Sequence, residues 1–216
     1  MNHPQSKPRG MTALPALGRE WLPVLLFMLM ILVARSTLAD HYHVPSGSME
    51  PSLVPGDHVL VDKSAYGYRF PFTNQVLLAG DSPRAGDVVI FDSPVDGVRL
   101  IKRVVAVAGD VVAVQAGRVW INGEPRATVS MPAGRAQERI VVERYDVRAV
   151  PLNLAAGGGP NLAPVQVPDG QVLVLGDHRG NSRDGRYFGF VPAASLYGKA
   201  TGVFWRRGSG PTWQPL

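Results

Sequence analysis

Cysteine is absent from this chain of 216 residues. Its absence excludes disulfide bonds, thiolate metal ligands and a cysteine nucleophile. The compartment stays open, because an oxidising compartment permits disulfides without requiring them. Long apolar runs are also scarce, and the only one covers residues 21–34, 14 residues without a charge.

The excess charge is small and basic, with 22 Lys and Arg against 17 Asp and Glu. The arginines between Arg69 and Arg148 are scattered and form neither a basic helix nor a patch interleaved with aromatics. Those features mark a nucleic-acid interface, so we expect no nucleic-acid partner. A modest attraction to anionic lipid headgroups suits this composition better.

The apolar run, WLPVLLFMLMILVA, predicts a transmembrane helix. A helix of that length covers about 21 Å, which is short of the roughly 30 Å hydrocarbon core of a bilayer. Continuing through Arg35 to Ala39 makes up most of the deficit, because an arginine side chain can reach back to the interface. We therefore expect a membrane anchor over residues 21–39.

The basic residues around this run predict its orientation. Three precede it and one follows directly: Lys7, Arg9 and Arg19, then Arg35. The positive-inside rule places residues 1–20 in the cytoplasm and the chain beyond about residue 40 outside. A cleavable signal peptide ending at Thr37-Leu38-Ala39 is the alternative. Trp21 and Arg35, as interface anchors at the two ends, favour the uncleaved helix.

Beyond the anchor the sequence is typical of a β protein. Glycine (24) and proline (19) are frequent, and short apolar stretches alternate with turn signals. None of these stretches keeps a helical period over three turns. The expected strands cover residues 58–63, 87–91, 98–108, 110–115, 118–123, 171–176 and 199–205. Asn122-Gly123 is a hairpin signal, and the whole predicts an all-β extracytoplasmic domain, a barrel or paired sheets.

Residues 117–169 differ in composition from the rest. They carry several prolines and the segment AAGGGPN at 155–161, with one clear strand at 140–147. We interpret this segment as a small inserted β lobe. The main domain then consists of residues 41–116 and 170–206, followed by a tail at 207–216.

Three polar segments are candidates for chemistry. The first is PSGSME, residues 45–50, where two serines flank a glycine about ten residues beyond the apolar run. Proline, glycine and serine commonly make a simple turn. This segment alone is therefore weak evidence of a site.

The second segment is RLIKRVVAVAGD, residues 99–110. In a strand, Lys102 shares one face with Leu100, Val104 and Ala106, while Arg99 and Arg103 point the other way. Desolvation on an apolar face lowers a lysine pKa from about 10.4. Either the stem packs and the amine reaches water, or a neutral amine is available to take a proton from a hydroxyl.

The third segment is LGDHRGNSRDGRYFGFVP, residues 175–192. Polar residues crowded between apolar strands form either a surface loop or a buried hydrogen-bonded network. Asp184 and Arg186 are placed to pair across a turn, and Ser182 to meet a neighbouring amine.

Taken in order after an anchor, PSGSMEP, IKRVVAVAGD and GDHRGNSRDGRYFGFVP resemble the conserved boxes of bacterial type I signal peptidases, which are Ser-Lys serine proteases. The resemblance runs from about residue 42 to residue 205. It implies an enzyme of the cytoplasmic membrane, single-pass, whose catalytic domain faces outward and cuts signal peptides from exported preproteins. No metal or nucleotide cofactor is implied.

The resemblance also implies roles for individual residues. Ser48 is the expected nucleophile and Lys102 its general base, with an oxyanion hole from the Ser48 backbone N–H and the Ser46 hydroxyl. Ser182 is expected to hydrogen-bond the Lys102 amine. The supporting loop comprises Asp177, Asn181, Asp184 and Arg186. The expected lining of pockets for small substrate side chains is Tyr42, Val44, Leu53, Leu100 and Ile101.

Two positions depart from the common family pattern, since His178 stands for asparagine and Gly180 for aspartate. His178, oriented by Asp177 or Asp184, is therefore an alternative base. His41-x-His43 puts two imidazoles on one strand face, but no third ligand pattern follows, which favours a polar rim over a metal site.

Three alternative functions compete with this interpretation, and the second is the hardest to exclude. The first is a self-cleaving repressor-type domain, which would need a DNA-binding helical domain that this N-terminus does not offer. The second is a processing peptidase dedicated to pilus or conjugation substrates. The third is a non-enzymatic, membrane-tethered binding domain, which would have no use for Ser46, Ser48, Lys102 and Ser182 together.

Overall fold

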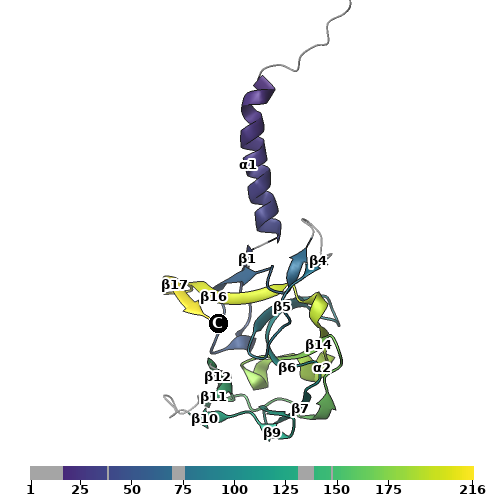
Figure 1. The fold of residues 1–216 in the computed structure, drawn as a ribbon. Helices are drawn as coiled ribbons and strands as arrows, with labels where there is room; N and C mark the ends of the chain where they lie inside the picture. Colours follow the sequence, from purple (N-terminus) through teal and green to yellow (C-terminus); the bar gives the residue numbers. More distant parts are fainter. Residues whose placement is uncertain (1–16, 38, 70–75, 131–138, 147) are drawn as a thin grey trace, which may run out of the picture.

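The computed structural model describes residues 17–37, 39–69, 76–130, 139–146 and 148–216 (Figure 1). Helix α1 (Leu17–Thr37) carries the apolar run and stands out from the body as a single rod (Figure 1). Its large apolar side chains from Trp21 to Leu32 are all exposed. Within the described residues, no helix combines the length and the apolarity needed to cross a membrane. The span expected over residues 21–39 therefore stays a prediction.

The body is mainly β and is organised around one open, antiparallel sheet. The strand order is β1-β2-β16-β5-β6-β14-β15, and β17 pairs with β16 outside that path. The bounds are β1 (Ala39–His43), β2 (His58–Asp62), β5 (Val88–Asp92), β6 (Arg99–Val107), β14 (Gln171–Leu175), β15 (Val191–Pro192), β16 (Gly198–Arg206) and β17 (Gly210–Pro215). The prediction of a mainly β body is confirmed.

Three smaller sheets complete the described part of the body. One has the order β13-β7-β8-β9, formed by β7 (Val111–Gln115), β8 (Arg118–Ile121), β9 (Glu124–Pro125) and β13 (Leu162–Gln166). The others are β10 (Thr128–Ser130) with β11 (Ile140–Tyr145) and β12 (Arg148–Asn153), and the pair β3 (Gly67–Arg69) and β4 (Val76–Ala79). Four short helical turns are η1 (Gly47–Met49), η2 (Arg179–Asn181), α2 (Gly185–Phe188) and η3 (Ala193–Ser195).

The expected lobe at residues 117–169 contains β8 to β13, but one of its two sheets, β13-β7-β8-β9, also takes in β7, which lies within the residues expected for the main domain. β7 pairs with β8 on one side and β13 on the other. Val112 and Val114 are fully buried together with Val105 and Leu173 of the main sheet. Because this apolar core runs from β6 and β14 into β7, the two parts share a core at that point.

The expected strands and the hairpin turn are present where the sequence places them. Each of the seven predicted stretches overlaps an observed strand. Asn122 and Gly123 both adopt positive φ, 53° and 86°, and they join β8 to β9, as expected for this dipeptide.

β6 lies in the middle of the molecule, and every side chain from Ile101 to Ala106 is buried. On one side Ile101 packs with Val44, Met49 and Leu53. Val104 packs with a second group that includes Val89 and Phe91 of β5. Polar side chains on this strand are therefore held out of water by apolar neighbours, which sets the electrostatics of the site.

Candidate active site

The serine turn is fixed by backbone bonds and by one apolar anchor. Val44 N donates to Asp57 O at 2.8 Å, and Leu53 N donates to Met49 O at 2.9 Å. The Met49 side chain is buried in the core beside Val44. Because Met49 points inward, the two serines of the turn are left at the surface, with Ser46 Oγ 3.4 Å from Ser48 Oγ.

Lys102 reaches this turn from the centre of β6. Its Nζ lies 2.6 Å from Ser48 Oγ and 3.0 Å from the carbonyl oxygen of Ile101. The residue is 3% exposed. Burial lowers the pKa of Lys102 from 10.5 to about 8, although the charges of Asp184 and Asp177 oppose that shift. The result is an amine in contact with a hydroxyl and substantially neutral in mildly alkaline solution.

His178, the alternative base, does not contact the Ser48 hydroxyl. Its backbone N–H donates to Ser48 O at 3.1 Å. Its ring Nδ1 lies 3.6 Å from Glu50 Oε2, and neither ring nitrogen has a hydrogen bond within the described part of the chain. The folding of the chain thus brings Lys102, and not the His178 ring, to Ser48 Oγ.

Asp184 organises the loop that follows β14. Its Oδ2 accepts from Gly176 N at 2.9 Å, and its carboxylate binds Arg186 through Nε and Nη2, both at 2.8 Å. It also caps α2 by accepting from the Arg186 backbone N–H. Arg186 continues to the carbonyl oxygens of Arg179 and Gly158, at 2.6 and 2.5 Å. The pairing of Asp184 with Arg186 expected from the sequence is confirmed.

Ser182 is placed beside the serine turn without the expected bond. It is 8% exposed, and its Oγ has no hydrogen-bond partner among the described residues. A Cβ added at Gly176 would come within 2.3 Å of Ser182 Oγ and 2.5 Å of Ser48 O. Glycine at 176 is therefore required for the two serines to approach, but the predicted bond from Ser182 to the Lys102 amine is not formed here.

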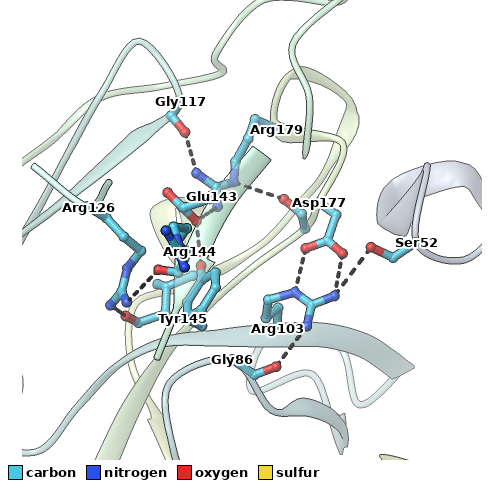
Figure 2. A network of polar contacts seen from close by, with 12 residues as sticks. Ser52, Gly86, Arg103, Gly117, Arg126, Glu143, Arg144, Tyr145, Asp177 and Arg179 are labelled. Atoms are coloured by element: carbon cyan, nitrogen blue, oxygen red, sulfur yellow. Dashed lines mark hydrogen bonds and ion pairs between the residues drawn. The ribbon is translucent and has the colours of Figure 1, made fainter. Parts of the chain in front are cut away.

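Asp177 has a partner that the sequence analysis did not assign. Arg103, next to Lys102 on β6, donates to both Asp177 carboxylate oxygens at 2.9 and 2.7 Å (Figure 2). It also donates to Gly86 O at 2.7 Å and to Ser52 Oγ at 3.3 Å. Both charges are buried. The signal in the sequence was a second basic residue directly after Lys102 in a valine-rich strand, a residue type that is rarely buried unpaired.

A second buried ion pair ties the loop to the inserted lobe (Figure 2). Arg179 Nη2 lies 2.8 Å from Glu143 Oε2 of β11, and another guanidinium nitrogen donates to Gly117 O. Tyr145 Oη donates to the same carboxylate at 2.5 Å. Burial alone would lower the pKa of Arg179, but Glu143 raises it overall. Neither residue was singled out from the sequence, because they lie 36 positions apart.

A cleft of about 170 Å³ opens in front of the two serines. Its lining comprises Tyr42, His43, Val44, Pro45, Ser46, Ser48, Met49, Arg99, Leu100, Ile101 and Lys102. Four of the five expected lining residues are among them. Leu53 is not, because its side chain is fully buried in the core behind Met49 and Ile101. Asn181 is exposed in η2, and its backbone N–H donates to His178 O at 2.9 Å.

Arg99 is the arginine of the cleft lining. It donates to Tyr42 Oη and forms an ion pair with Asp92 at 2.5 Å. Its guanidinium also stacks 4.3 Å from the Tyr197 ring centre. In the described ranges, no set of three or more His, Asp or Glu residues is arranged to hold a metal ion.

Comparison with known proteins gives a consistent result. The family described as signal peptidase, peptidase S26, matches residues 18–205. Signal peptidase I of Pseudomonas fluorescens is 35% identical over 207 residues, covering 87% of this chain and 71% of that protein. Signal peptidase I of Pseudomonas aeruginosa is 33% identical over 204 residues, with the same coverage. A crystal structure of a signal peptidase I from Enterococcus faecalis V583 has a TM-score of 0.38 and 29% identity, covering 56% of this chain and 98% of that one.

Proposed function

This chain belongs to the signal peptidase family, peptidase S26, and from that premise we propose that it removes signal peptides from exported preproteins by means of Ser48 and Lys102. Its activity is that of a signal peptidase I. The observation that carries the assignment of residues is the 2.6 Å contact between Lys102 Nζ and Ser48 Oγ, made by an amine whose pKa is lowered to about 8.

In the proposed mechanism the neutral amine of Lys102 takes the proton of Ser48 as Oγ attacks the scissile carbonyl carbon. The C–N bond then breaks, and the ammonium of Lys102 returns the proton to the leaving amine. Water attacks the resulting acyl-enzyme ester with Lys102 again as base. The signal peptide leaves with a new carboxylate, and Ser48 recovers its hydroxyl proton.

The oxyanion of the tetrahedral intermediate is proposed to bind between the Ser48 backbone N–H and the Ser46 hydroxyl. The 3.4 Å separation of the two hydroxyl oxygens supports this, since it puts a second donor beside the attacking atom. Donors fixed in advance stabilise the transition state more than the ground state. The turn is fixed by buried Met49 and by its backbone bonds, which meets that requirement.

The loop from Asp177 to Arg186, Asn181 included, is proposed to hold the catalytic groups in place. Asp177 fixes Arg103 next to Lys102, and Asp184 fixes Gly176 against the serine turn. Ser182 is proposed to accept a hydrogen bond from the Lys102 amine after a rotation of its side chain about the Cα–Cβ bond, which moves Oγ. Its buried Oγ, which has no hydrogen-bond partner in the described residues, supports this, because an unmade bond at a buried hydroxyl is unfavourable.

The substrate is proposed to place small side chains in the cleft. Tyr42, Val44, Leu100 and Ile101 line it, and its volume of about 170 Å³ suits small residues before the cut. The lining is mostly apolar, which matches substrates that begin with an apolar signal segment.

The membrane anchor over residues 21–39 is part of the proposal, with residues 1–20 in the cytoplasm and the catalytic domain outside. The exposed apolar side chains from Trp21 to Leu32 support it. So does the position of α1 directly before β1 (Figure 1), because β1 ends only a few residues ahead of Ser48. We propose the catalytic domain as residues 41–116 and 170–206, with the lobe at 117–169.

The test is cleavage of a preprotein in detergent by the wild type, Ser48→Ala and Lys102→Ala, with folding checked by circular dichroism. We expect the wild type to cut after a small residue and both variants to fold without cutting. Cleavage by Lys102→Ala at a rate comparable with the wild type would overturn the assignment of the base. A wild type that cuts none of a panel of preproteins would overturn the proposed substrate class.

A further inference from the structure

Two histidines face each other across neighbouring strands beside the cleft. His43 of β1 and His58 of β2 are direct register partners. Their ring centres lie 5.3 Å apart, with the planes inclined at 69°. The sequence shows only His41-x-His43 on one strand, and the register of β1 with β2 supplies the second ring from another part of the chain.

Both rings have their nitrogens available. His43 is exposed and His58 is half-buried. Within the part of the chain that the structure describes, the two side chains make ring contacts, to each other and from His58 to Phe204 at 5.9 Å, and neither takes part in a hydrogen bond or an ion pair. Imidazole nitrogens without competing hydrogen bonds are free to act as ligands.

The separation of the rings matches two ligands on one ion. An imidazole nitrogen lies about 2.0–2.1 Å from Zn²⁺, which puts each ring centre about 3.2 Å from the ion, and a tetrahedral angle then separates two ring centres by about 5.2 Å. The observed 5.3 Å agrees with this. We propose that His43 and His58 form a two-histidine site for a divalent transition metal ion at the rim of the cleft.

The ligand set decides which ions fit and how they are held. Imidazole suits Cu²⁺, Ni²⁺ and Zn²⁺, and affinity for a given nitrogen site rises towards Cu²⁺. No third His, Asp or Glu completes the site within the described residues, so water fills the other positions. The site is therefore an exchangeable one, distinct from a resident cofactor, and the peptidase chemistry does not depend on it.

The position of the two-histidine site implies that a bound metal ion affects cleavage of the preprotein, an inference that rests on the proposed function. His43 lines the cleft together with Ser46 and Ser48. An ion held by His43 carries water molecules into the mouth of that cleft. Bound metal should therefore obstruct the approach of the preprotein, and a chelator should reverse the effect.

The decisive experiment measures binding without activity. The detergent-solubilised full chain is titrated with Cu²⁺ while tryptophan fluorescence is followed. Trp205 of β16 is the register partner of His58, so a paramagnetic ion at the pair is expected to quench it. His43→Gln and His58→Gln should each weaken binding at least about tenfold, the loss typical even of outer partners of a metal. Circular dichroism checks that each variant folds.

His41→Gln is the matched control. His41 lies on the same face of β1, is also exposed and pairs with Leu60, not with a histidine. It should bind Cu²⁺ as the wild type does. Equal loss in His41→Gln, or full binding in both His43→Gln and His58→Gln, would overturn the site.

A second pair of measurements separates this proposal from the proposed function. Ser48→Ala should bind Cu²⁺ like the wild type even though it cannot cut, because neither ligand depends on Ser48. Preprotein cleavage by the wild type should fall on addition of Cu²⁺ and recover with chelator, while His58→Gln, which is not in the cleft lining, should resist. Binding without any inhibition would overturn the claim that the ion obstructs the cleft.

Discussion

At the scale of single residues, the environment of Lys102 sets the pH range in which its amine is able to accept a proton. A lysine in water is charged at neutral pH and cannot accept a proton. Burial in β6 removes hydration from the charged form and lowers its pKa to about 8. The buried carboxylates Asp177 and Asp184 limit that shift, and each is itself neutralised by an arginine.

The first prediction follows from the neutral fraction of Lys102. Below its pKa of about 8, the neutral fraction grows about tenfold per pH unit, so kcat/KM should rise with that slope and level off above. Initial rates on a preprotein measured from about pH 6 to about pH 10 will show it, provided the enzyme stays folded. A profile that is flat over this interval contradicts Lys102 as the base.

The second prediction concerns the Ser46 hydroxyl. Ser46→Ala should lower kcat by about 10²–10³-fold with little change in KM, since an oxyanion donor acts mainly in the transition state. Steady-state kinetics on a peptide substrate provides the measurement. Ser195→Ala, an exposed hydroxyl in η3 that donates to Pro192 O, is the control and should retain full activity. A loss seen only in KM would point to substrate binding in place of oxyanion stabilisation.

At the scale of elements, the loop after β14 is held by a buried ion pair. The Asp184 carboxylate pairs with the side chain of Arg186 and accepts hydrogen bonds from Gly176 N and from Arg186 N, the second of which caps α2. Gly176 in turn lies against Ser48 O and Ser182. The position of the serine turn therefore depends on the ion pair that holds this loop.

The third prediction tests that coupling. Asp184→Asn leaves the buried guanidinium of Arg186 without its counter-charge, which should cost about 3–5 kcal/mol of unfolding free energy, and activity should fall with it. Chemical denaturation in detergent measures the first effect. Asp96→Asn breaks an exposed pair with Arg183 and should change stability little. Equal effects in the two variants would show that burial of the Asp184 pair is unimportant.

The expected strands, the Asn122-Gly123 turn and the Asp184–Arg186 pair could all be predicted from local sequence. Each depends on residues close together in the chain, whose pattern of alternation or turn chemistry is visible directly. Leu53 shows the limit of this approach. It is apolar and stands at a position that the family resemblance implies for the cleft, but the turn after Met49 directs it into the core.

At the scale of the whole molecule, two buried ion pairs connect parts that are distant in sequence. Arg103 of β6 meets Asp177 of the loop, and Arg179 of the loop meets Glu143 of the lobe (Figure 2). The lobe is therefore attached to the loop after β14 by the second of these ion pairs, and to the main sheet by the apolar core around Val112 and Leu173.

The fourth prediction uses a double-mutant cycle on the pair Glu143 and Arg179. Glu143→Leu alone should reduce the unfolding free energy by about 3–5 kcal/mol, because the buried arginine loses its partner, whereas adding Arg179→Met should recover most of that loss. Denaturation of the two single variants and of the double variant gives the coupling energy. Additive losses would mean that the two residues act independently.

The fifth prediction is the membrane topology, and the lack of cysteine makes it simple to test. Val95→Cys is on an exposed loop of the body and should react with a membrane-impermeant maleimide in spheroplasts. Asn2→Cys should react only after the membrane is opened, as the basic residues before the apolar run predict. Labelling of Asn2→Cys in intact spheroplasts would reverse the orientation.

The sequence by itself determined the mainly β body and the family. Three short segments, in their order along the chain, identified the family. Short apolar stretches between turn signals predicted the strands. The tertiary structure decided which groups meet: Lys102 and not His178 at Ser48, Arg103 at Asp177, Arg179 at Glu143, and His58 opposite His43. The physical reason is the same throughout, because such contacts depend on strand register and on burial by residues far away in the chain, and neither is encoded in local spacing.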